Sequence, residues 1–64
     1  MTYKLKAARV GKGIKQKDFA NHLGISVQNL IQIEKGKTEP RRDLMIRIAE
    51  GLGEDVTTLF FDEN

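Results

Sequence analysis

The stretch FANHLGISVQNLIQIEKG, from Phe19 to Gly36, constrains the fold more than any other part of the chain. Apolar residues on both sides of Gly24 follow the period of a helix rather than the alternation of a strand. Gly24 can adopt the left-handed backbone that closes one helix, and Ser26 is well placed to cap the next. The chain is therefore expected to hold two short helices tightly together across a turn of a few residues.

The rest of the chain follows the same helical period. We predict helices over residues 3–10, 16–23, 27 to 34 or 35, 42–52 and, after a cap at Asp55, a short last helix through residue 60. Gly51 lies inside the fourth of these, where it costs about 1 kcal/mol relative to alanine, so we expect that end to fray. No strand is needed, and the prediction is one all-α domain over residues 1–64.

The residue inventory limits the chemistry that the chain can perform. The chain has 64 residues, no cysteine and one histidine, His22, so it offers neither a disulfide nor a thiolate metal site. The glycines at 11 and 13 lack the strand and spacing of a phosphate-binding loop. No apolar run reaches the roughly 18 residues of a membrane span, and no signal-peptide core is present. We expect a cytoplasmic protein without catalytic activity, metal or cofactor.

The charges are divided unevenly along the chain. All 11 Lys and Arg lie between Lys4 and Arg47, where only four acids oppose them, which gives this part a net charge of +7. The part from Ile48 to Asn64 holds five acids and no base, a net charge of −5. A basic body favours a polyanionic partner, although a solvated helical surface would show the same composition.

The helix pair has a specific register. With Gln16 in the first position, a small residue, a glycine and five apolar residues follow in the pattern Phe19, Ala20, Leu23, Gly24, Ile25, Leu30 and Ile33. Ala20 must be small because the second helix crosses close over it, and Gly24 makes the turn. This is the pattern of a helix-turn-helix, with its core at about residues 16–35, whose second helix lies in the major groove of DNA.

The run IKQKDFANHLGISVQNLIQIEKGKTEP, followed by LMIRIAEGLG, resembles the Xre/Cro type of helix-turn-helix transcriptional regulators, the lambda-repressor-like DNA-binding domain. The resemblance extends from Leu5 to Phe60. Its most specific elements are Gln16, the Leu-Gly pair at 23–24, IEKGK at 33–37 and Pro40. It implies a compact five-helix domain, encoded by a prokaryote or a phage, whose third helix enters the major groove of double-stranded DNA.

Amide side chains on the outer side of this third helix suit base recognition, because Gln and Asn pair bidentately with adenine in the major groove. The resemblance places Val27, Gln28 and Gln32 toward the bases, with Asn29 and Ile31 at the margins. Apolar side chains can contact a thymine methyl group, so we favour an A·T-rich half-site. In the alternative interpretation, Val27 and Ile31 only cover the hydrophobic stem of a neighbour.

Gln16 is predicted to bind a backbone phosphate, because free N–H groups and the helix dipole favour an anion at a helix N-terminus. Residues flanking the third helix are further candidates for phosphate contacts: Lys15, Lys17, Lys35, Lys37, Thr38, Arg41 and Arg42. We favour Lys37, Thr38 and Arg41, which lie in the loop that relatives place along the DNA backbone. Arg42 stands where relatives commonly have an apolar residue, and either points to DNA or folds its stem over the core.

Two charged residues have a structural role in the family. Residues matching Arg9 and Glu34 pair across the first and third helices in relatives. A partly buried pair of this kind fixes geometry more reliably than it adds stability, so we expect it to hold the recognition helix in place. His22 has no visible partner in the sequence and is predicted to be a surface residue.

A homodimer is predicted from the size of the site. One helix in one groove reads too few base pairs to select a site in a genome, and relatives bind two half-sites about 34 Å apart. We therefore expect a pseudo-palindromic operator. The interface would lie in the C-terminal segment 54–64, with Leu59, Phe60 and Phe61 as candidates. The first two also suit the core, so Phe61 is the residue expected to meet the partner, unless it folds back near Tyr3.

The sequence thus predicts a sequence-specific DNA-binding transcriptional regulator, with repression favoured over activation. An antitoxin or a protein-interaction module with the same fold is the alternative. An antitoxin usually carries an additional segment that holds its toxin, and this chain ends soon after the fifth predicted helix. No site for a small-molecule effector is evident.

Overall fold

Five helices account for most of residues 4–61, the part of the chain that the computed structural model describes. They are α1 (Leu5–Gly11), α2 (Gln16–Leu23), α3 (Val27–Glu34), α4 (Arg42–Leu52) and a short π-helix, η1 (Thr57–Phe61). The described residues contain no strand. The all-α, five-helix prediction is confirmed, and α2 and α4 have the predicted bounds.

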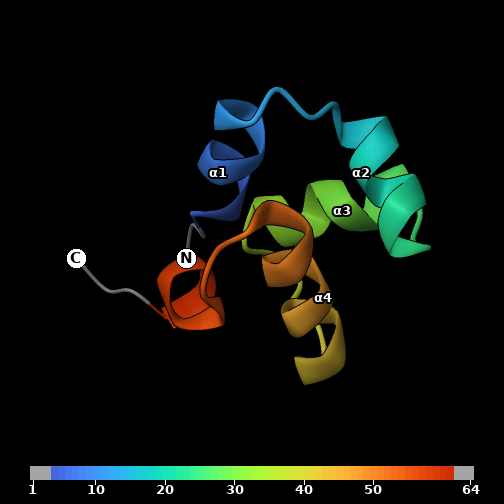
Figure 1. Cartoon of the computed structure of the whole chain (residues 1–64). Coiled ribbons are helices and arrows are strands. Elements are labelled where there is room, and N and C mark those ends of the chain that lie inside the picture. The colour runs from blue at the N-terminus through green and yellow to red at the C-terminus, as the bar shows by residue number, and fades with distance from the viewer. Residues whose placement is uncertain (1–3, 62–64) are drawn as a thin grey trace.

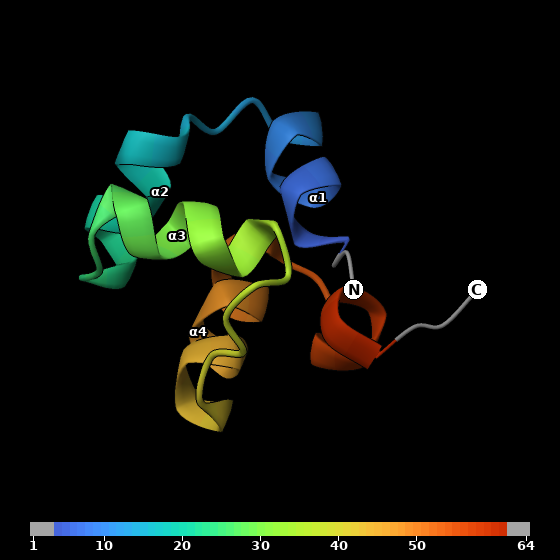
Figure 2. The same ribbon diagram turned by 180° about the vertical axis from the view of Figure 1, so that it is seen from behind.

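The helices pack around α4 and α3, which cross one another (Figure 1). In Figure 1, α4 lies in front of α3, and the view from behind brings α3 across the front of the molecule (Figure 2). The beginning of α1 lies beside η1, where the backbone N–H of Lys4 donates to the carbonyl of Leu59 at 3.2 Å. The body measures 28 × 22 × 19 Å, so every helix has one side near the centre and one side near the surface.

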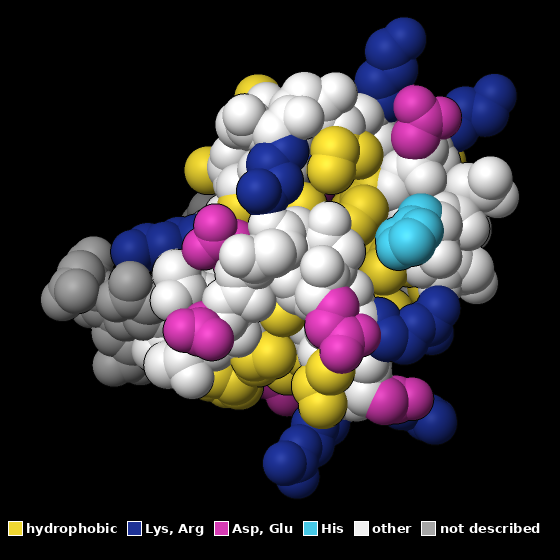
Figure 3. Space-filling view, in the orientation of Figure 1, with side chains coloured by type: hydrophobic (Ala, Val, Ile, Leu, Met, Phe, Trp, Pro, Cys, Tyr) yellow, Lys and Arg dark blue, Asp and Glu magenta, His cyan; other side chains and the backbone are white. Residues whose placement is uncertain are grey.

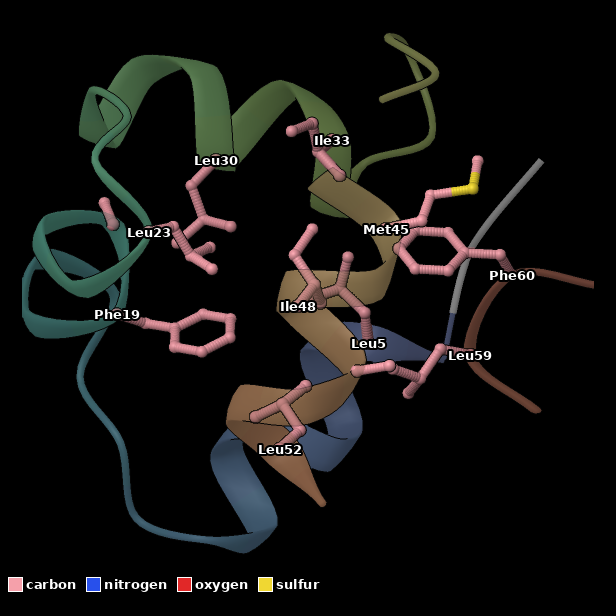
Figure 4. Packing of buried hydrophobic residues seen from close by; sticks show 12 residues of the cluster. Leu5, Phe19, Leu23, Leu30, Ile33, Met45, Ile48, Leu52, Leu59 and Phe60 are labelled. Carbon is pink, nitrogen blue, oxygen red and sulfur yellow. The ribbon is translucent and has the colours of Figure 1, made fainter. Parts of the chain in front are cut away.

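All five helices contribute to one hydrophobic core (Figure 4). Leu5 comes from α1, Leu30 from α3 and Ile48 from α4, and none of these three side chains is exposed. The remaining buried apolar residues are Phe19, Ala20, Leu23, Ile33, Met45, Ala49, Leu52, Leu59 and Phe60. A domain of this size buries only about 60% of its unfolded surface, so each of these side chains contributes a large share of the stability.

The ends of the first and last helices differ from the predicted ones. α1 begins at Leu5 and includes Gly11, whereas the sequence predicted residues 3–10, and Tyr3 lies outside the described residues. η1 reaches Phe61, one residue further than predicted. The backbone carbonyl of Asp55 accepts a hydrogen bond from the N–H of Leu59 at 3.1 Å. A backbone hydrogen bond therefore holds the start of the last helix.

Gly51 has a packing role that the helix propensities do not reveal. α4 continues through Gly51 to Leu52, which is fully buried, so its predicted bounds are confirmed, and the fraying of this end stays a prediction. A Cβ atom at Gly51 would lie 2.9 Å from Cε1 of Phe19. The absence of a side chain therefore lets α2 approach α4. The Phe19 ring also stacks on His22, with 6.4 Å between ring centroids, and His22 is exposed as predicted.

Candidate nucleic-acid interface

The turn between α2 and α3 is fixed by backbone hydrogen bonds and two side chains. Gly24 has a φ of +74°, and the N–H of Ile25 donates to the carbonyl of Ala20 at 3.0 Å, as in a Schellman motif. The hydroxyl of Ser26 accepts from the N–H of Asn29 at 3.0 Å, which confirms the predicted cap. Arg47 of α4 donates from its guanidinium to the carbonyl of Leu23. The geometry of the helix pair is therefore set from both sides of the turn.

The inner side of α3 is anchored in the core. Leu30 and Ile33 are buried, and Ala20 lies buried on α2 where α3 crosses it. Side chains three and four residues apart share one face of a helix, so this anchoring decides which residues of α3 face outward. The rotation of α3 about its own axis is thus determined by packing.

Polar amides occupy the outer side of α3. Gln28 and Asn29 are exposed and Gln32 is half-buried. Gln28 and Gln32 are one turn apart and share one face, so both amides lie on the same side of the helix. Val27 and Ile31 are half-buried, and Val27 packs partly against the core. This contact agrees with the covering role of the alternative interpretation, and the base contact of Val27 stays a prediction.

A recess lies on each side of this amide face. One recess, of about 300 Å³, is lined by Lys6, Gln16, Ile31, Glu34 and Lys35. The other, of about 320 Å³, contains Asn29, Thr38 and Arg41 among its lining residues. Asn29 and Ile31 lie on opposite sides of Gln28 because successive residues are 100° apart around a helix. The structure therefore brings the predicted base contacts and several predicted phosphate contacts around one helix.

All the predicted phosphate contacts other than Gln16 have exposed side chains. Lys15, Lys17, Lys35, Lys37, Thr38, Arg41 and Arg42 are all exposed. Arg42 also lines an apolar groove beside Met45 and Ile46, so both roles considered for its side chain are open to it. On the face of the molecule seen in Figure 3, acidic and basic side chains are intermixed, without a stripe of one sign.

A buried ion pair joins α1 to α3. Arg9 donates from Nε to Oε2 of Glu34 at 2.6 Å and from Nη2 to Oε1 at 3.3 Å. Its Nη1 donates to the carbonyl of Ile14 at 2.7 Å. Gln16 joins the same carboxylate, donating from Nε2 to Oε1 of Glu34 at 2.8 Å. One carboxylate thus links the end of α3 to α1 and to the first residue of α2.

Residues 5–59 match the profile of the helix-turn-helix family. The chain belongs to this helix-turn-helix family. A protein of Methanocaldococcus jannaschii, named an uncharacterized HTH-type transcriptional regulator, is 39% identical over 64 residues, which cover 100% of this chain and 97% of that protein. These likenesses support a DNA-binding regulator as the general class of function.

The three predicted interface residues at the C-terminal end of this helix-turn-helix protein differ in exposure. Leu59 and Phe60 are 2% and 3% exposed, so they belong to the core of their own chain rather than to a surface. Phe61 is 56% exposed. It lines an apolar groove of about 520 Å³ with Ile46, which is 41% exposed. The contact of Phe61 with Tyr3 that the sequence left open lies outside the described residues.

Two residues of the helix-turn-helix site were missed by the sequence analysis. Lys6 lies one turn before Arg9, and this spacing could have placed it beside Glu34. Arg47 carried no local signal, because its contact with Leu23 depends on how α4 crosses α2. The hydrogen bond between Gln16 and Glu34 was also missed, although both residues had been singled out for other roles.

Every buried side-chain nitrogen and oxygen of the described residues has a hydrogen-bond partner. Within the same residues, no group of three or more His, Asp and Glu is arranged to hold a metal ion. None of the described helices is long and apolar enough to cross a membrane.

Proposed function

We propose that the protein is a sequence-specific transcriptional regulator that places α3 in the major groove of double-stranded DNA. One observation carries the proposal: Gln28 and Gln32 lie outward on a helix whose opposite side, with Leu30 and Ile33, is locked in the core. An amide on a rigid helix can pair bidentately with adenine. The name of the relative from Methanocaldococcus jannaschii supports the same class of function.

Phosphate contacts hold the helix in the groove. Contacts to phosphates fix register and orientation, whereas contacts to bases carry the sequence information. Lys37, Thr38 and Arg41 lie in the loop between α3 and α4 and are exposed on one flank. Gln16 and Lys35 line the recess on the other flank. The two flanks would meet the two DNA strands that border the groove.

The ion pair of Arg9 and Glu34 serves as a scaffold for these contacts. It is buried and bidentate, and such pairs fix geometry more than they stabilise the fold. Glu34 also holds the amide of Gln16. We propose that this network fixes how Gln16, the predicted phosphate contact, is oriented relative to the predicted base contacts on α3.

The regulator acts as a homodimer on a pseudo-palindromic operator, and repression is its expected mode of action. The exposed Phe61 and Ile46 line one apolar groove, and a second copy of the chain is the occupant that would double the number of bases read. Single exposed apolar residues are common on monomers. Here two of them border the same groove, and this arrangement supports an interface.

Selection of bound duplexes from random DNA tests the proposed function. We expect enrichment of A·T-rich half-sites repeated about 34 Å apart, the spacing of one helical turn. Binding to a random duplex should weaken steeply with salt, because Lys and Arg displace counterions from phosphates. If no duplex is bound even at low salt, the proposal is wrong. Enrichment of single half-sites would contradict only the dimer.

A further inference from the structure

The recess between α1 and α3 contains a lysine that no prediction used. Lys6 of α1 lines it together with Gln16, Ile31, Glu34 and Lys35. α1 lies outside the helix-turn-helix pair, at its edge. The proposed function gives no role to this cation from α1, although it lies beside the recognition helix.

The recess carries an uncompensated positive charge. Its one acid, Glu34, is already neutralised by the bidentate contact with Arg9. Among the described residues, neither Lys6 nor Lys35 forms an ion pair. The two ammonium groups therefore remain available to an anion from outside the chain.

Three residues with hydrogen-bond donors line the same recess. Each lysine ammonium has three donors, and the amide nitrogen of Gln16 has two hydrogens. One of those hydrogens goes to Oε1 of Glu34 at 2.8 Å. This bond orients the amide, and the second hydrogen of its nitrogen can be donated to a ligand. Two charged donors and one oriented neutral donor suit an oxyanion better than a carbonyl group, since phosphate oxygens accept several strong hydrogen bonds.

The recess borders the amide face of α3. Ile31 and Lys35 are one turn apart and line it, and they lie next to Gln28 and Gln32 on the helix surface. A helix seated in the major groove has the sugar-phosphate backbone along both of its sides. A phosphate therefore lies close to this recess whenever Gln28 and Gln32 reach the bases.

We infer that this recess binds one phosphate of the DNA backbone and that Lys6 extends the DNA contact of the protein to α1. Gln16, held by Glu34, and Lys35 complete the contact. The inference rests on the proposed function, since it needs α3 in the major groove. It adds a specific consequence: α1 takes part in affinity, but not in the choice of sequence.

The salt dependence of binding measures this contact. Each phosphate neutralised by a cation contributes about 0.9 to the slope of log K against log salt concentration. Lys6→Ala should therefore lower the magnitude of that slope by about 1 and weaken the selected and random duplexes by the same factor. Lys6→Arg keeps the charge and should retain the slope of the wild type.

Lys12→Ala is the matched control. Lys12 is an exposed lysine just after α1, but its Nζ lies near Gly53, 3.8 Å from the position that a Cβ atom would occupy there, at the end of α4. Its removal should leave the slope unchanged. Both lysines are exposed, and thermal melting of each variant confirms that the fold is retained.

The outcomes separate this inference from the proposed function. If the wild type binds duplex DNA with a steep salt dependence while Lys6→Ala and Lys12→Ala have the same slope, the contact at Lys6 is wrong and the proposed function stands. If Lys6→Ala changed base preference rather than overall affinity, the assignment to a phosphate would also be wrong. Absence of any duplex binding by the wild type would overturn both.

Discussion

The outer face of α3 and the C-terminal face both consist of residues that do not take part in the core. The first exposes polar amides and the second exposes an aromatic ring. On α3, Leu30 is buried while Gln28 is exposed. At the C-terminus, Phe60 is buried while Phe61 is exposed. In both places the inward residue satisfies the core, so the outward residue is not needed for folding.

The difference between these faces indicates two kinds of partner. Amides on a rigid helix, with Lys6 and Lys35 in the recess on one side, suit an anionic partner with base edges to read. The ring of Phe61 and the side chain of Ile46 along one apolar groove suit a protein surface. Since the outward residues of the two faces are exposed while their inward neighbours form the core, we expect substitutions in the core, at Phe61 and at Gln28 to affect stability, association and DNA binding separately.

The largest effect is expected from Leu30→Ala. Leu30 is fully buried on the inner side of α3, and loss of such a side chain costs about 2–5 kcal/mol. In a domain this small that loss could unfold the protein. Urea denaturation measures the free energy of unfolding. An unchanged value would show that α3 is rotated from the position described, which would remove the basis of the comparison.

Gly51→Ala tests the packing between α2 and α4, with Gly11→Ala as its control. Both glycines lie in helices, where alanine is favoured by up to about 1 kcal/mol. A Cβ atom at Gly51 would meet the Phe19 ring at 2.9 Å, whereas nothing lies within 4 Å at Gly11. We expect Gly51→Ala to destabilise by about 1–3 kcal/mol, as overpacking does. Gly11→Ala should be neutral or stabilising.

A gain in melting temperature for Gly51→Ala as large as that for Gly11→Ala would contradict this account. It would mean that the Phe19 ring moves aside without cost, and that helix propensity alone decides the outcome at both sites.

Phe61→Ala sharpens the comparison at the C-terminal end. Burial of one phenylalanine side chain is worth about 1.5–3 kcal/mol, so its loss should weaken dimerisation at least about tenfold. Val10→Ala is the control, because Val10 is 58% exposed on α1 and does not line the groove. Sedimentation at micromolar concentration, with and without a duplex of two half-sites, distinguishes them. A wild type that stays monomeric in both conditions would contradict the dimer.

The helix-turn-helix core was predictable because its determinants are local. Gly24 supplies the left-handed turn, Ser26 the cap, and the spacing of Leu30 and Ile33 the buried side of α3. Each of these signals acts over a few residues, within the reach of helical periodicity. The bounds of α2 followed from the same pattern.

The contacts that were missed depend on how distant helices cross. Arg47 reaches Leu23 and Gln16 reaches Glu34 over separations of 24 and 18 residues. No local pattern encodes such contacts. The role of Gly51 was missed for the same reason. Its cost in a helix can be read from the local sequence, whereas the close approach of Phe19 depends on how α2 crosses α4. For this reason the sequence indicated the residues of the candidate site better than their partners.

Binding of Gln28→Ala to a selected duplex and to a random duplex, compared with Lys37→Ala, tests the central claim most directly. Gln28 is an exposed amide of α3, and Lys37 is an exposed cation in the loop that follows. Gln28→Ala should cost about 1–3 kcal/mol on the selected site and relax the preference at one base position, whereas Lys37→Ala should weaken both duplexes equally. Equal losses on both duplexes for Gln28→Ala would contradict base recognition by α3.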